Sequence, residues 1–199
     1  MSKTVLFSLS GSYVWPMAIG LLVYFVCLIL FFRHKKPLQN FFLAVLFMYL
    51  AVVFELTISI PLPQHWHISA KATAWAISRI DWIPFESAAN ILHNSIRIGN
   101  FKEFFRVIGG NFIMLMPLGV LVPLINPRFR FGRMLALSIL VPLGIEGLQL
   151  LGNILSGSAT RNVEMEDVIL NAAGCLLAYL IFASLRGLFG PKHRGRHYS

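Results

Sequence analysis

Polar side chains that could bind an anion or transfer a proton lie within two apolar segments in the C-terminal half of the chain. A charge deep in a bilayer costs about 2.5–3.5 kcal/mol on insertion scales, so polar residues in such segments are candidates for function. Arg161, in the short connection between the two segments, adds a planar guanidinium whose donors match the oxygens of a phosphate or carboxylate. The candidate ligand-binding residues are Glu146, Gln149, Arg161, Asp167 and Asn171.

The spacing of these residues predicts two polar stripes on neighbouring helices. Glu146 and Gln149 are three residues apart, and Asn153 continues the same helix face. Asp167 and Asn171 are four residues apart and share one face of the following helix. Two antiparallel spans joined by a short connection pack side by side, and lipid cannot solvate polar groups. We therefore expect the two stripes to face each other or the interior of the bundle.

The same residues permit more than one kind of role. Glu146 and Asp167 are the catalytic candidates, as acid or base, with Arg161 stabilising an anion. The chain lacks G-x-S-x-G, H-E-x-x-H and a Gly-rich phosphate loop, which weakens the case for an enzyme. A structural role would make Asp167 the N-cap of its helix and Glu146 a contact between helices. Ligand binding, catalysis and a purely structural role are all compatible with the pattern.

No metal site and no cofactor are predicted. His65 and His67 form a pair without a third ligand, which is a poor metal signal. Cys27 and Cys175 both fall in the middle of apolar segments, and their separation makes no metal site. A disulfide between them is also not expected.

The composition indicates a small integral membrane protein. The 199 residues are 57% hydrophobic and 13% charged, whereas soluble domains carry about 25% charged residues. The net charge of +9 could suggest nucleic-acid binding. The basic residues, however, lie next to apolar runs, as topology signals do. We therefore predict one membrane domain over residues 1–199 and no nucleic-acid partner.

The apolar runs predict an all-α fold, a polytopic membrane helical bundle with about five transmembrane helices. The first run is a span rather than a signal peptide, because four basic residues follow it and only Lys3 precedes it. An outer interfacial segment separates spans two and three, and a short helix is expected over residues 69–80. Pro117 should kink the third span. The predicted spans cover residues 13–32, 41–60, 107–125, 134–152 and 167–185.

Charge distribution predicts the orientation of the bundle. With the N-terminus outside and five spans, the C-terminus is cytoplasmic, and every acidic residue lies on the outer side or in a span. The reverse orientation would place three strongly basic segments outside. The residues assigned to the inner side are Arg33, Lys35, Lys36, Arg128, Arg130, Arg133, Arg186, Lys192, Arg194 and Arg196.

Three phrases together resemble the VanZ-like membrane proteins of bacteria over about residues 80–185. The first is the Ile-Pro-Phe phrase at 83–85, and the second is Asn-Phe-Ile-Met-Leu-Met-Pro-Leu-Gly at 111–119. The third is Glu-x-x-Gln at 146–149, followed by an arginine and by Asp-x-x-x-Asn-x-x-Gly at 167–174. The order and spacing of the phrases carry the resemblance. Asp81 departs from the family, which more often has Asn-Leu before Ile-Pro-Phe.

The resemblance implies a small all-helical membrane bundle and an association with resistance to the lipoglycopeptide antibiotic teicoplanin. It also implies structural-motif roles for Pro84, Phe85, Asn111, Pro117, Gly119 and Gly174.

The first functional hypothesis is a protein of the bacterial cell envelope that binds an anionic lipid, a lipid-linked precursor or a lipoglycopeptide at the outer leaflet. The alternatives are an intramembrane enzyme acting on a lipid headgroup and a structural subunit without a ligand. Membrane lipids are the expected partners. The oligomeric state is left open.

Overall fold

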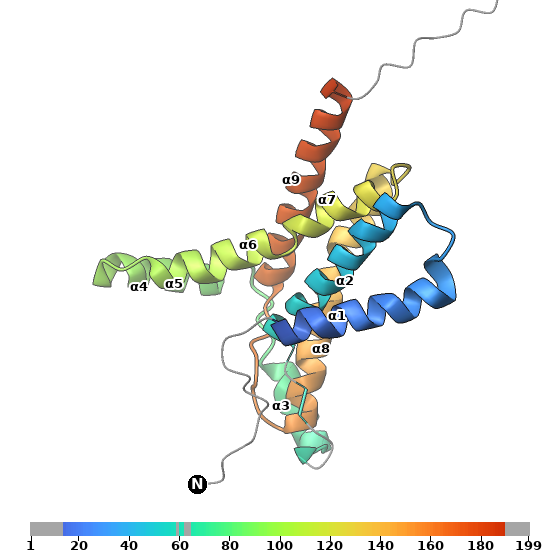
Figure 1. Ribbon diagram of the computed structural model, residues 1–199. Helices are drawn as coiled ribbons and strands as arrows, with labels where there is room; N and C mark the ends of the chain where they lie inside the picture. The colour runs from blue at the N-terminus through green and yellow to red at the C-terminus, as the bar shows by residue number, and fades with distance from the viewer. Residues whose placement is uncertain (1–13, 59, 62–64, 190–199) are drawn as a thin grey trace, which may run out of the picture. The chain divides into compact units, whose positions relative to one another are not determined.

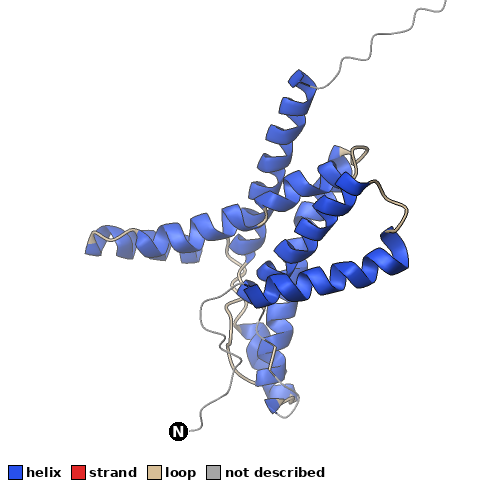
Figure 2. Ribbon diagram, in the orientation of Figure 1, coloured by secondary structure: helices blue, strands red, loops and turns tan. Residues whose placement is uncertain are grey.

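The fold is all-α in a computed structural model that describes residues 14–58, 60–61 and 65–189. Its regular elements are helices joined by loops (Figure 2). Within these ranges the only β-type pairing is an isolated parallel bridge between Asp81 and Glu164. The predicted fold class, an all-helical membrane bundle, is confirmed.

Five helical stretches are long and apolar enough to cross a bilayer. The third begins at Lys102 rather than near residue 107, because the helix continues without a break from Lys102 to Met114. The first stretch is α1 (Val14–Cys27) continued by the π-helix η1 (Leu28–Phe32), and the second is α2 (Pro37–Thr57). The third joins α5 (Lys102–Phe104), the π-helix η3 (Phe105–Gly109), α6 (Gly110–Met114) and α7 (Met116–Ile125). The fourth is α8 (Phe131–Ser156), and the fifth is α9 (Met165–Phe189). Two shorter helices, α3 (Ala70–Ser78) and α4 (Glu86–Ile98), lie between the second and third stretches.

The chain divides into two compact units, which are described separately below. The first comprises residues 1–80, 124–126 and 145–163, and the second comprises 81–123, 127–144 and 164–199.

In the first unit, α1 and α2 form a helical hairpin (Figure 1). A methyl group added at Gly20 would lie 2.5 Å from the carbonyl oxygen of Phe47, so only glycine allows the two backbones to approach this closely. The ring of Phe47 contacts the rings of Tyr24 and Phe32, at centroid distances of 6.1 and 6.4 Å. The backbone and the ring of Phe47 therefore both contact α1 and η1, and these contacts hold the hairpin together.

The short helix expected over residues 69–80 is present as α3. Ser69 is its N-cap, and its hydroxyl oxygen accepts a hydrogen bond from the backbone N–H of Ala72 at 3.0 Å. The segment before it is tied to the end of α8, because the N–H of His67 donates to the carbonyl of Leu155 at 2.8 Å. The part of the loop around His67 is thus anchored beside the end of α8.

In the second unit, α6 packs on α9 through a glycine. A methyl group added at Gly174 would overlap the backbone carbonyl oxygen of Phe112, so the two helices meet backbone to backbone. The helix is interrupted where a kink at Pro117 was expected, since α6 ends at Met114 and α7 begins at Met116. Proline fits the first turn of a helix, where its missing N–H leaves no hydrogen bond unmade.

Polar contacts at the basic loop between α7 and α8 show which helix ends lie together within each unit. In the second unit, Arg186 near the end of α9 donates to the carbonyl of Pro127 at 3.2 Å. In the first unit, Gln39 near the start of α2 donates to the carbonyl of Ile125 at 3.0 Å. Residue 127 of the loop therefore lies beside the end of α9, and the residue that ends α7 lies beside the start of α2.

Candidate functional site

Asn153 organises the loop that carries Arg161 in the first unit. The residue is 3% exposed. Its Oδ1 accepts hydrogen bonds from the N–H and hydroxyl of Thr160, at 2.8 and 2.9 Å, and from the N–H of Arg161 at 3.2 Å. Its Nδ2 donates to the carbonyl of Arg161 at 2.8 Å. The backbone on both sides of Arg161 is consequently fixed by one buried amide.

The Arg161 side chain extends from this fixed backbone to the end of α2. Its Nη2 donates to the carbonyl oxygen of Leu56 at 2.7 Å. Carbonyls in the last turn of a helix have no partner within the helix, so this bond satisfies one of them. Among the described residues, it is the one hydrogen bond that the guanidinium makes, and the residue is exposed. The remaining N–H donors are therefore available to an anion.

Gln149 satisfies the next carbonyl of the same helix end. Its Nε2 donates to the carbonyl oxygen of Thr57 at 3.1 Å, while its Oε1 is buried without a hydrogen-bond partner in the described structure. Glu146 lies almost one turn earlier on α8 and is 7% exposed. The predicted stripe of Glu146, Gln149 and Asn153 is therefore buried along its length and leads to Arg161.

The second unit contains the other predicted stripe. The Asn111 amide of α6 donates to Oδ1 of Asp167 on α9, which links the two helices. Asn171 is 2% exposed, and its Nδ2 donates to the backbone carbonyl of Asp167 at 2.8 Å. Its Oδ1 is buried and lacks a partner in the part of the chain that the structure describes. Asp167, Asn171 and Asn111 thus form one connected polar group.

The structure accordingly divides the five predicted ligand-binding residues between the units. Glu146, Gln149 and Arg161 belong to the first unit, and Asp167 and Asn171 belong to the second.

A group of three carboxylates at the start of α9 was not predicted from the sequence. Glu164, Glu166 and Asp167 each offer an oxygen within 4.8 Å of the others. Glu166 is 1% exposed, and its Oε2 accepts a hydrogen bond from the N–H of Ala88 at 3.2 Å. Carboxylate oxygens are the ligands that Mg²⁺ and Ca²⁺ prefer, so among the described residues this is the group that could hold such a cation. The signal in the sequence was the run Glu-Met-Glu-Asp immediately before an apolar segment.

The predicted motif residues lie at close contacts and turns of the second unit. Phe85 has φ of 67°, a left-handed conformation that is uncommon for a bulky residue, and it directly precedes α4. Pro84 before it fixes the entry into that turn. A methyl group at Gly119 would overlap the backbone carbonyl oxygen of Cys175. These motif positions therefore shape the backbone.

Comparison with known families gives one result. A family model described as VanZ/LLP1 matches residues 42–186, which is well over half of the chain and includes every candidate site residue. No curated protein and no solved structure gives a significant match.

Proposed function

The chain belongs to the VanZ/LLP1 family, and from that premise we propose that it is a multi-pass protein of the bacterial cell membrane that binds an anionic group at the outer leaflet. The group is a phosphate or carboxylate carried by a membrane lipid, a lipid-linked precursor or a lipoglycopeptide. Binding would contribute to resistance to teicoplanin-type antibiotics.

The proposal rests on the exposure of Arg161 and on the hydrogen bonds that hold its backbone and side chain. The residue is exposed, its backbone is held on both sides by buried Asn153, and one end of its guanidinium is fixed by the Leu56 carbonyl. A guanidinium held in this way loses little rotational freedom when it binds an anion, so more of the interaction energy is retained. No carboxylate pairs with this guanidinium within the described ranges, so its charge is available to a ligand.

We infer the orientation from charge. The basic turn after the first span and the basic loop at residues 128–133 are assigned to the cytoplasm, which leaves the N-terminus and Arg161 outside. The contact of Arg186 with the carbonyl of Pro127 supports this assignment, since it brings a third basic segment to the side of the basic loop. An extracellular Arg161 would meet headgroups of the outer leaflet.

A structural role is the second candidate, and one observation favours it. Arg161 and Gln149 both donate to carbonyls at the end of α2, so each residue already stabilises the first unit. If this were their whole function, substitutions would lower activity only as far as they lower the amount of folded protein.

Substitution of Arg161 separates the two candidates. Arg161→Gln should abolish any protein-dependent change in teicoplanin susceptibility while the amount of protein in the membrane is retained. Arg161→Lys should restore part of the effect, because it keeps the charge but not the planar fork. Arg79→Gln is the matched control, since Arg79 is an exposed arginine of the same unit whose guanidinium lies over the Trp75 ring.

Two outcomes would count against anion binding. Susceptibility that stays unchanged in Arg161→Gln would contradict it directly. A loss of effect that only follows a loss of protein abundance would favour the structural role.

A further inference from the structure

The three carboxylates at the start of α9 form a cluster that is largely buried. Glu164 and Glu166 are 9% and 1% exposed, and Asp167 is half-buried. Each of the three contributes an oxygen that lies within 4.8 Å of the oxygens of the other two. The backbone of a fourth acidic residue, Asp81, lies beside them, because it pairs with Glu164 in the isolated bridge and its carbonyl accepts from the N–H of Met165 at 2.9 Å. All of these residues belong to the second unit.

One carboxylate oxygen of the cluster is buried and has no hydrogen-bond donor. Glu166 accepts a hydrogen bond from the N–H of Ala88 with Oε2, but its Oε1 is buried without a partner among the described residues. A buried polar group without a partner costs free energy, and a buried charge without a counter-charge costs more. A cation bound between the carboxylates would give Oε1 of Glu166 the partner that it lacks.

A second acceptor without a donor lies next to the cluster on α9. The side-chain amide of Asn171 donates to the backbone carbonyl of Asp167 at 2.8 Å, which holds the amide beside that residue. Its Oδ1 is buried and has no partner within the described ranges. Two buried acceptors without donors therefore accompany the three carboxylates.

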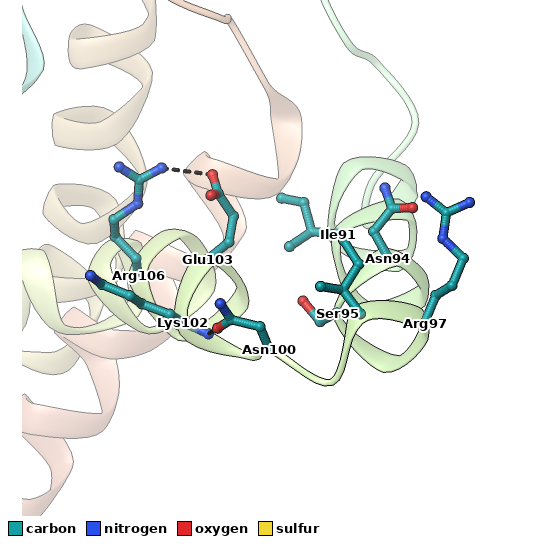
Figure 3. A pocket seen from close by; sticks show the side chains of 9 residues that line it. Ile91, Asn94, Ser95, Arg97, Asn100, Lys102, Glu103 and Arg106 are labelled. Carbon is teal, nitrogen blue, oxygen red and sulfur yellow. Dashed lines mark hydrogen bonds and ion pairs between the residues drawn. The ribbon is translucent and has the colours of Figure 1, made fainter.

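Basic side chains do not neutralise the two carboxylates that are fully accounted for. In the cavity between α4 and α5, by contrast, Oε1 of Glu103 pairs with Nη2 of Arg106 at 2.6 Å, as Figure 3 shows. The donors to Glu166 and Asp167 are neutral, namely the N–H of Ala88 and the amide of Asn111. In the part of the chain that the structure describes, no basic side chain forms an ion pair with either carboxylate.

The spacing of the oxygens fits a calcium ion. Ca²⁺ lies about 2.3–2.6 Å from its oxygen ligands, and Mg²⁺ lies about 2.0–2.1 Å from them. Two oxygens on opposite sides of one ion are therefore at most about 4.6–5.2 Å apart for Ca²⁺ and about 4.0–4.2 Å apart for Mg²⁺. Oxygens that lie within 4.8 Å of one another can all reach one Ca²⁺ without a movement of the backbone.

We propose that Glu164, Glu166 and Asp167 bind one Ca²⁺ ion. Each side chain supplies a carboxylate oxygen, and water completes the coordination of the ion. Glu166 is bonded to Ala88 of α4, and Asp167 is bonded to Asn111 of α6. The bound ion thus ties the start of α9 to both helices. Arg161 takes no part in this site, so the site does not depend on the proposed function.

Equilibrium dialysis of the full-length protein against radioactive Ca²⁺ at neutral pH counts the bound ions. The protein is held in nanodiscs of phosphatidylcholine, whose headgroup is neutral overall, so that the lipid contributes little binding. The wild type should bind one Ca²⁺. Glu166→Gln and Asp167→Asn keep the shape of each side chain, remove one charge, and should each bind at least about tenfold more weakly, since affinity follows the number of charged ligands. The matched control is Glu55→Gln, at an exposed carboxylate of the first unit, which should bind like the wild type.

Thermal unfolding separates the loss of the ion site from the loss of the fold. Ca²⁺ at about 100 times its Kd should raise the Tm of the wild type by about 5–10 °C, because the site exists only in the folded protein. In EDTA, Glu166→Gln should unfold at or above the temperature of the wild type, because it removes one of several charges that repel one another. Added Ca²⁺ should then have little effect on the Tm of this variant.

Several results would overturn the proposal. A wild type that binds no Ca²⁺, with the same Tm in Ca²⁺ and in EDTA, would show that protons neutralise the cluster. Equal Ca²⁺ binding by the wild type and both variants would place the ion elsewhere, and a Tm of Glu166→Gln far below that of the wild type in EDTA would contradict the repulsion. Mg²⁺ that binds more tightly than Ca²⁺ would overturn the choice of ion. Arg161→Gln should bind Ca²⁺ like the wild type, so either proposal can fail while the other stands.

Discussion

Replacing Asn153 with leucine should destabilise the protein and weaken anion binding together. Leucine is similar in size but cannot make any of the four hydrogen bonds that Asn153 makes with Thr160 and Arg161. Each bond contributes about 0.5–1.5 kcal/mol net, and water can reach the exposed loop to replace part of it. The free energy of unfolding should therefore fall by about 2 kcal/mol, which is the sum of four bonds at the lower value for each. This corresponds to a fall in Tm of about 4–8 °C.

The assay is thermal unfolding in lipid nanodiscs, followed by tryptophan fluorescence, together with phosphatidylglycerol binding. Thr160→Val removes one of the four bonds and should lower Tm by less than half as much. Asn90→Leu is the control, because Asn90 is an exposed asparagine on α4. If Asn153→Leu left both Tm and anion affinity at wild-type values, the amide would not hold the Arg161 loop and the reasoning would be refuted.

Two further predictions concern the second unit. Gly174→Ala should lower stability by about 1–3 kcal/mol, because the added methyl overlaps the Phe112 carbonyl and forces α6 and α9 apart. Gly144→Ala, at a helical glycine with open space around it, should not lower Tm, and an equal effect of both changes would contradict the close helix contact. Asn111→Leu should lower Tm, since it removes the amide that donates to Asp167 among neighbouring carboxylates; an unchanged Tm would show that this bond does not hold α6 to α9.

Much of the fold could be predicted from the sequence, because membrane spans are long apolar runs. Each long helix overlaps such a run, and the interruption beside Pro117 follows from the chemistry of proline. The amphipathic helix α4 was missed. It is only 13 residues long and mixes apolar with polar side chains, so a search for long apolar runs does not detect it.

The candidate site was predictable as a set of residues but not as a set of contacts. Helical spacing grouped Gln149 with Asn153, and the structure shows both as buried side chains with amide donors. Their partners, the Thr57 carbonyl and the Arg161 backbone, are main-chain groups whose position depends on how the helices end. Glu166 illustrates the same point, since its partner is the N–H of Ala88, 78 residues away. Sequence spacing alone cannot assign such pairs.

The free energy that Arg161 contributes to anion binding is the quantity on which the account depends most. Native mass spectrometry of the wild type, Arg161→Gln and Arg161→Lys, titrated with phosphatidylglycerol and with teicoplanin, measures it directly. We predict that Arg161→Gln loses one bound anionic ligand while its free energy of unfolding falls by at most about 1.5–3 kcal/mol, the value of one hydrogen bond to a charged group. Equal occupancy of the anionic ligand in all three proteins would contradict anion binding by Arg161. The role of Arg161 would then be to stabilise the end of α2.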